Sequence, residues 1–216
     1  LVVCLFVLLL AFFVAVVGAL AVWSHQRFAK ALWAVLLLPS FWVGAEWLRV
    51  MIWDGFPWLL VGYSHTDTWL AGWAPLAGTL AVSFAVSVSV GLLWLLMRSV
   101  QWFPVALAFG LFWSFSGYLT SLSWVEAKGE GTPVALVHGQ VSETIKWNTD
   151  ALTPILRAYQ QASEPFIGKA KVIVWPETAI PTFLDSVMPA LDEFSQRAEQ
   201  AQTQVVSGVA LREDSL

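Results

Sequence analysis

The distribution of charge along the chain constrains its fold more than any other feature. No charged residue occurs over residues 1–24, 68–97 or 105–125, whereas charges become frequent beyond Glu126. Soluble domains carry a charge on roughly a quarter of their residues, but charged residues make up only 12% of this chain. We therefore predict a membrane domain over residues 1–125 and a water-soluble domain over residues 126–216. No basic stripe indicates a nucleic-acid partner.

Four apolar runs are long enough to cross a membrane. A membrane span needs about 20 mostly apolar residues, and such runs lie at about residues 2–22, 31–50, 75–97 and 105–124. The hydrocarbon core offers the backbone no hydrogen-bond partner, so each span must satisfy its own backbone groups. We therefore predict a multi-pass α-helical membrane domain with four transmembrane helices.

The positive charges between these spans predict their orientation. Arg27 and Lys30 lie in the first connection and Arg98 in the third, whereas the second, residues 51–74, has no Lys or Arg. Basic connections face the cytoplasm. We therefore predict that residues 51–74, and everything after Trp124, lie on the extracytoplasmic side.

The second connection is unusually rich in aromatic, Gly and Pro residues. Trp and Tyr favour the membrane–water interface, and Gly and Pro allow a folded, non-helical path. Two interpretations stay open, an aromatic belt or a surface segment that helps to shape a lipid-binding site. The residues concerned are Trp53, Gly55, Phe56, Pro57, Trp58, Gly62, Tyr63 and Trp69.

Two ionisable residues lie at the end of the second span. Glu46 and Arg49 are three positions apart, which places them on one helical face. Ionisable groups at membrane depth are costly and are usually paired or functional. We expect either a structural ion pair at the interface or a functional role.

The soluble domain alternates short apolar strands with helices. Strands are predicted at residues 133–137, 171–175 and 204–210. One helix is expected to begin with Thr153 as its N-cap and Pro154 as its first residue, and another to span residues 186–202. This alternation predicts an α/β layer fold. We expect its strands to be buried and mostly central, in a sheet that is incomplete.

Glu177 is the strongest candidate for chemistry. It follows an apolar strand directly, and the carboxyl ends of such strands are where sites gather in α/β sheets. Pro176 and Pro181 stiffen the surrounding backbone, and we expect Glu177 to be buried among Trp175, Pro176 and Ile180. The residues alone leave open whether Glu177 is a general base or a solvated turn residue.

The order of several motifs makes the chain resemble one family. Trp-Pro-Glu-Thr-Ala-Ile-Pro at 175–181 resembles the glutamate motif of the nitrilase superfamily in its apolipoprotein N-acyltransferase form. Further matching motifs are Glu-Trp-Leu-Arg at 46–49, Gly-Phe-Pro-Trp-Leu at 55–59, Gly-Tyr-Ser at 62–64, Ala-Leu-Val-His-Gly-Gln at 135–140 and Lys-Trp at 146–147. Each motif alone is weak, but together, in one order, they are specific.

The resemblance implies a fold and a reaction. The soluble part would be an incomplete nitrilase-like α/β domain, an α-β-β-α sandwich. The family moves a fatty acyl chain from a membrane phospholipid onto a catalytic Cys, then onto the amine of the diacylglyceryl-cysteine that heads an apolipoprotein. Glu177 matches the general base, and Trp147 matches a tryptophan needed near the site, with core packing as its alternative. Gly55, Trp58 and Tyr63 would bind substrate or shape its site.

The resemblance also implies the setting of the enzyme. We expect no metal or cofactor, a monomer among membrane lipids, and a bacterial inner-membrane protein with its catalytic domain on the periplasmic side. The membrane part makes a tethered amidase of the same superfamily less favoured, because an anchor needs one span. A transporter or scaffold would leave the Glu177 motif without a role.

The chain departs from the family pattern in one respect. The family's Lys and Cys follow the glutamate motif later than Leu216, and the one cysteine, Cys4, lies in the first span. Lys169 and Lys171 precede the motif and match neither residue. The sequence begins inside an apolar run and ends just after an apparent strand. We therefore expect a fragment of a longer protein that is inactive by itself.

Overall fold

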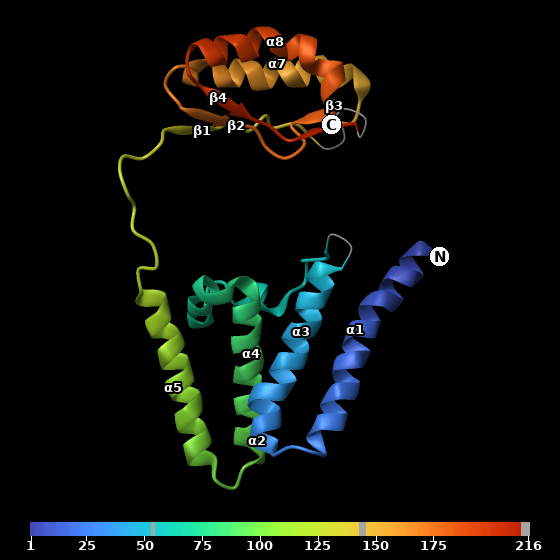
Figure 1. Ribbon diagram of the computed structural model, residues 1–216, viewed down its shortest axis with the longest axis vertical. Helices are drawn as coiled ribbons and strands as arrows, with labels where there is room; N and C mark the ends of the chain where they lie inside the picture. Colours follow the sequence, from blue (N-terminus) through green and yellow to red (C-terminus); the bar gives the residue numbers. More distant parts are fainter. Residues whose placement is uncertain (53–54, 143–145, 213–216) are drawn as a thin grey trace. The chain divides into compact units, whose positions relative to one another are not determined.

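The computed structural model describes residues 1–52, 55–142 and 146–212, and the chain divides into two compact units (Figure 1). The division falls between Glu126 and Ala127, one residue from the boundary that the charge pattern predicts. Trp53, which belongs to the aromatic-rich connection, lies outside the described residues. Each unit has its own core.

The first unit consists of long apolar helices (Figure 1). Its helices are α1 (Val2–His25), α2 (Lys30–Leu32), α3 (Leu38–Met51), α4 (Ala74–Arg98) and α5 (Trp102–Ser121), and a π-helical turn, Trp33–Leu37, joins α2 to α3. Among the described residues, four helical stretches are long and apolar enough to cross a membrane. These stretches confirm the four predicted spans as helices.

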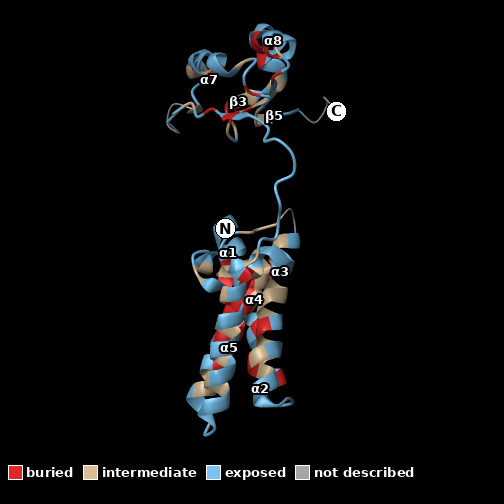
Figure 2. Ribbon diagram, turned by 90° about the vertical axis from the view of Figure 1, so that its left-hand side faces the viewer, coloured by how far each residue is buried: buried red, intermediate tan, exposed pale blue. Residues whose placement is uncertain are grey.

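Helix α4 is the centre of this unit, because it packs against α3 and α5. Buried residues gather along it (Figure 2). A Cβ atom on Gly91 would lie 2.0 Å from the carbonyl oxygen of Ala34, so only glycine lets α4 approach the π-helical turn this closely. Trp113 Nε1 donates a hydrogen bond of 3.1 Å to Ser89 Oγ across the contact with α5. Small residues and such polar bonds are what hold helices together within lipid.

The second connection is folded onto the ends of the helices. It contains two 3₁₀ helices, η2 (Val61–His65) and η3 (Trp69–Trp73). Gly62 packs against the Thr79 carbonyl oxygen and Gly72 against the Ser116 carbonyl oxygen, where an added Cβ would lie 2.4 and 2.6 Å away. Helical dihedrals are interrupted at Ala77 and Gly78, so the regular part of α4 spans residues 79–98, which is shorter than the predicted third span.

The second unit is an α/β layer. Strands β1 (Val134–Leu136), β2 (Val172–Val174) and β4 (Gln204–Val206) form a parallel sheet in the order β1-β2-β4, and β3 (Ile180–Phe183) pairs in parallel with β5 (Val209–Ala210). Helices α7 (Leu152–Ser163) and α8 (Leu184–Gln200) lie on one face of the sheet (Figure 1). Their apolar sides and the sheet form one core, which includes Ala135, Ile155, Tyr159, Ile173, Trp175, Val187 and Phe194.

Several element boundaries differ from the prediction. The single strand predicted at 204–210 is two strands in two sheets, interrupted at Ser207 and Gly208, where Gly208 packs against the Glu177 turn. Strand β3 was not predicted. Ala151, not Thr153, is the N-cap of α7, so Thr153 and Pro154 both lie in its first turn. Helix α8 begins at Leu184, two residues before the predicted start.

The strands are buried on one face only, which corrects the prediction of buried, mostly central strands. Side chains alternate between the two faces of a strand. Ala135 and Ile173 point into the core beneath the helices, whereas Val134 and Leu136 are 52% and 80% exposed. Only β2 is central in the described sheet. The face opposite α7 and α8 therefore remains apolar and uncovered in the described part of the chain.

Candidate functional site

A pocket lies where the carboxyl ends of β1 and β2 meet. Its volume is about 200 Å³, and its lining comes from the segments after both strands and from α7. This edge of a parallel sheet is the usual place for a site in an α/β fold. The lining residues are His138, Val141, Lys146, Ile155, Tyr159, Pro176, Glu177 and Ala179.

The residue before the glutamate motif is firmly anchored. Trp175 is buried between Tyr159 of α7 and Phe194 of α8, with ring centroids 5.2 and 5.6 Å apart. Its Nε1 donates a hydrogen bond of 2.9 Å to Ser163 Oγ, and its backbone N–H donates to the Val206 carbonyl. A buried aromatic ring with its polar atom satisfied fixes the end of β2. The start of the Glu177 turn is therefore held by the core.

The turn that carries Glu177 has an unusual backbone. The N–H of Ala179 donates to the Pro176 carbonyl at 3.2 Å, which closes a tight turn. Thr178 has φ +52°, a left-handed conformation that is rare for a β-branched residue. A Cβ on Gly208 would lie 2.8 Å from the Thr178 nitrogen, so the chain after β4 packs closely against this turn. Strain of this kind gathers at functional sites and persists where the surroundings enforce it.

Glu177 itself is exposed, which corrects the expectation of burial. Trp175 and Ile180 are buried as expected, but the turn directs the Glu177 side chain toward the pocket and solvent. The reason is that Glu177 occupies the tip of the turn between Pro176 and Ala179. Its carboxylate is thus accessible to a reactant while its backbone is fixed.

The opposite wall is a second tight turn. The N–H of Gln140 donates to His138 Nδ1 at 3.2 Å, and Gln140 has φ +49°. A Cβ on Gly139 would lie 2.5 Å from Tyr159 Cζ, so only glycine fits against that ring. A carboxylate, an imidazole and the Lys146 ammonium thus line one pocket, a set that favours proton transfer next to a cation. In the sequence, His138 and Lys146 were identified only as parts of motifs, and Tyr159 was not predicted to line a site.

Trp147 lies beside this pocket but does not line it. Its side chain is 65% exposed, and the Lys146 Nζ lies 5.8 Å from the centroid of its ring. Trp147 is therefore not packed in the core formed by the described residues. Trp147 is an exposed aromatic surface next to a lining residue.

The other predicted site residues lie in the first unit. Gly55 has φ +85°, and a Cβ there would lie 2.2 Å from the Val50 carbonyl oxygen, so its role is to let the chain turn at the end of α3. Trp58 is 63% exposed, and its ring lies 5.2 Å from that of Phe56. Tyr63 is half exposed. The structure thus groups Trp58 and Tyr63 in one connection as exposed aromatics on a tightly held backbone.

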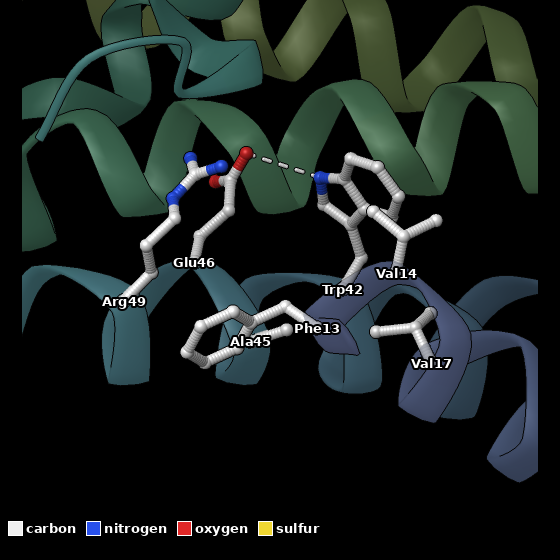
Figure 3. A pocket seen from close by; sticks show the side chains of 7 residues that line it. All are labelled: Phe13, Val14, Val17, Trp42, Ala45, Glu46 and Arg49. Atoms are coloured by element: carbon white, nitrogen blue, oxygen red, sulfur yellow. Dashed lines mark hydrogen bonds between the residues drawn. The ribbon is translucent and has the colours of Figure 1, made fainter. Parts of the chain in front are cut away.

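Glu46 is a hydrogen-bond hub rather than half of an ion pair. It is 4% exposed, and its Oε1 accepts a bond from Trp42 Nε1 at 3.0 Å (Figure 3). The same oxygen accepts a bond from the Val61 N–H at 2.9 Å. Among the described residues, neither Glu46 Oε2 nor Arg49 Nε has a hydrogen-bond partner. Arg49 Nη2 donates instead to the Leu59 carbonyl at 3.3 Å. Of the two alternatives expected for Glu46 and Arg49, the structural ion pair is therefore wrong, because each residue bonds to the folded connection.

Comparison with known proteins identifies relatives along nearly the whole chain. Residues 1–92 match the family model described as the apolipoprotein N-acyltransferase N-terminal domain. A protein of Coxiella burnetii named apolipoprotein N-acyltransferase is 32% identical over 214 residues, which cover 96% of this chain and 43% of that protein.

Two further relatives carry the same name. The protein of Shewanella oneidensis is 32% identical, covering 97% of this chain and 40% of its own length. The protein of Vibrio vulnificus is 34% identical, and the match covers 91% of this chain and 39% of that protein. The chain thus spans about two fifths of the length of these curated relatives. The family resemblance indicated by the motifs is confirmed.

Proposed function

This chain belongs to the apolipoprotein N-acyltransferase family, and we propose that it supplies the membrane part and the base-carrying part of an enzyme that acylates apolipoproteins. The acyl donor in this proposal is a membrane phospholipid, and the acceptor is the amine of an N-terminal diacylglyceryl-cysteine. The observation that carries the proposal is the Glu177 carboxylate, held by a strained turn at a pocket on the carboxyl edge of the sheet.

Glu177 is the general base of the proposed reaction. It accepts the proton of a thiol as the sulfur attacks the ester carbonyl of the phospholipid, and it returns that proton to the departing lysophospholipid oxygen. The acceptor amine then attacks the thioester, loses a proton to the same carboxylate, and the thiolate leaves and is reprotonated. Dividing the transfer in this way replaces one difficult step by two easier ones.

The unit that carries Glu177 contains no cysteine. Cys4, the one cysteine, lies within α1 of the first unit. We propose that the nucleophilic Cys and an oxyanion-stabilising Lys come from the part of the relatives that this chain does not cover. The 216 residues by themselves would then be inactive.

The uncovered sheet face supports the nitrilase-like sandwich. Val134, Leu136 and Val206 are exposed apolar side chains on strands whose other face is covered by α7 and α8. A sheet of a soluble domain buries both faces when its strands are parallel. We propose that a second β layer packs on this face in the complete protein, giving the α-β-β-α order.

The setting of the proposed enzyme is the bacterial inner membrane. In the part of the chain that the structure describes, four helices have the length and composition of spans. Arg27, Lys30 and Arg98 lie in the connections assigned to the cytoplasm. The second connection and the second unit would then both be periplasmic, where lipoproteins are acylated. A reporter enzyme that is active only after export, fused after Trp124, is expected to be active. A signal from the cytoplasm would reject this orientation.

Glu177→Gln tests the assignment directly in the full-length protein. The amide keeps the shape but accepts no proton, so acyl transfer to a diacylglyceryl peptide should fall by about 10²–10⁴-fold. Transfer from a labelled phospholipid in vesicles measures it. Glu193→Gln on the exposed side of α8 is the matched control. Near-normal transfer by Glu177→Gln would reject the base, and release of free fatty acid without transfer would favour a hydrolase.

A further inference from the structure

The segment that carries Trp58 has a backbone that the chain would not adopt unaided. Leu59 follows Trp58 and has φ +62°, although the left-handed region is unfavourable for a residue with a Cβ atom. Its side chain is 78% exposed, so no core packing holds it in this conformation. Other contacts must therefore enforce the path of the chain at this point.

Two hydrogen bonds from α3 hold this segment. Arg49 Nη2 donates to the carbonyl oxygen of Leu59 itself, at 3.3 Å. Two residues further on, the Val61 N–H donates to Glu46 Oε1 at 2.9 Å. Because Glu46 and Arg49 are one turn apart on a helix, both face the segment. Their hydrogen bonds hold the residues on either side of Leu60.

The surroundings of Glu46 make its bonds matter. Phe13, Val14 and Val17 of α1 and Ala45 of α3 line the pocket around the carboxylate (Figure 3). In such an apolar place, a polar group without a partner is costly, so the N–H groups of Val61 and Trp42 depend on Oε1. The other oxygen, Oε2, has no partner among the described residues. The carboxylate therefore serves the connection as an acceptor and does not neutralise Arg49.

The far end of the segment is fixed as well. The N–H of Gly62 donates to Ser83 Oγ at 2.8 Å, which ties η2 to α4. On the near side, the N–H of Phe56 donates to the Arg49 carbonyl at 3.0 Å, and the Phe56 ring packs edge-on against Phe6 of α1. Trp58 thus projects from a short stretch whose two ends are attached to different helices.

We propose that Glu46 and Arg49 are positioning residues that clamp Leu59–Val61 and thereby hold Trp58 against the phospholipid acyl donor. This inference rests on the proposed function, because the phospholipid acyl donor is part of that proposal. Trp at the membrane–water interface lies at the depth of lipid headgroups and esters. Fixing the ring before the lipid arrives removes the cost of ordering it upon binding.

The test compares Glu46→Leu with Glu46→Gln in the full-length protein in vesicles. Leucine removes the acceptor, whereas the glutamine oxygen still accepts from Val61 and Trp42. Glu46→Leu should raise the KM for phospholipid about tenfold with little change in kcat, and Glu46→Gln should restore most of the wild-type KM. Equal defects in both variants would show that the charge matters and would overturn the clamp.

Hydrogen exchange of residues 55–65 gives a readout that needs no activity. Exchange should rise in Glu46→Leu and stay near wild type in Glu46→Gln. If exchange rises in Glu46→Leu while its KM stays normal, the positioning role is wrong. If Glu46→Gln and wild type both lack acyl transfer while exchange behaves as expected, it is the proposed function that fails.

A second pair of variants remains informative if Glu46→Leu does not fold. Arg49→Met removes the bond to the Leu59 carbonyl and should also raise the KM for phospholipid. Adding Leu59→Gly should recover part of that loss, because glycine adopts positive φ without steric cost. No recovery in the double variant, with a folded protein, would overturn the link between Arg49 and the backbone of Leu59.

Discussion

Two glutamates, one in each unit, show how the same type of side chain takes different roles in different surroundings. Glu46 is buried, and one of its oxygens receives two N–H donors from within the chain. Glu177 is exposed at the tip of a strained turn and lines a pocket. The first carboxylate is occupied by the Trp42 indole and the Val61 backbone N–H, whereas the second is open to a reactant. A buried acceptor organises structure, and an accessible one on a rigid support suits chemistry.

Apart from replacing Glu177 itself, the largest effect expected from breaking this contrast comes from Gly208. Gly208→Ala places a Cβ 2.8 Å from the Thr178 nitrogen and must move the Glu177 turn. A misplacement of about 1 Å costs about 100-fold in rate, so we expect acyl transfer by the full-length protein to fall by about that factor. Gly131→Ala is the control, since nothing lies within 4 Å of its Cβ position. Equal activity in both variants would mean that the turn does not position the base.

For the free energy of unfolding, we expect replacement of Glu46 to matter more than replacement of Glu177. Glu46→Ala leaves the N–H groups of Val61 and Trp42 without an acceptor, which lowers the free energy of unfolding by about 2 kcal/mol. Glu177→Ala removes an exposed side chain and should change it by less than about 0.5 kcal/mol. Denaturant titration in detergent measures both. A greater loss in Glu177→Ala would reverse the assignment of structural and chemical roles.

Smaller effects are expected from the exposed tryptophans near each glutamate. Trp58→Ala and Trp147→Ala should each raise the KM for substrate by up to about tenfold, with little change in melting temperature, because both side chains are exposed and truncating a contact tryptophan costs about 1 kcal/mol or more. Trp102→Ala, at an exposed site at the start of α5, is the control. Wild-type kinetics for either variant would remove that residue from the substrate site.

The spans could be predicted because the signal lies within each segment. Runs of apolar residues specify α1, α3, α4 and α5 whatever they pack against. The strand at 204–210 failed because its apolar pattern continues through Ser207 and Gly208, and only the approach to Thr178 shows why the chain changes sheets there. A glycine within a predicted strand is a known sign of such a break. Gly208 was the one signal of this break that the sequence offered.

The candidate site was predictable in part. The strand before Glu177 placed that residue at the carboxyl edge of a sheet, where the pocket lies. The burial expected from its apolar neighbours was wrong, because the direction of a side chain in a turn depends on backbone dihedrals, which Thr178 and Gly208 set together. The helical spacing of Glu46 and Arg49 was read correctly as one face, but their partners, Val61 and Leu59, lie beyond the helix.

By itself, the sequence determined which segments are apolar helices, where the chain divides into two units, and which carboxylate follows a strand. Each of these depends on residues close together in the chain, through hydrophobic length and periodicity. Only the tertiary structure decided that Glu46 bonds to a folded connection, that Thr178 is held in a left-handed conformation, and that His138, Tyr159 and Glu177 share a pocket. Those outcomes depend on contacts between distant residues, whose geometry no local pattern specifies.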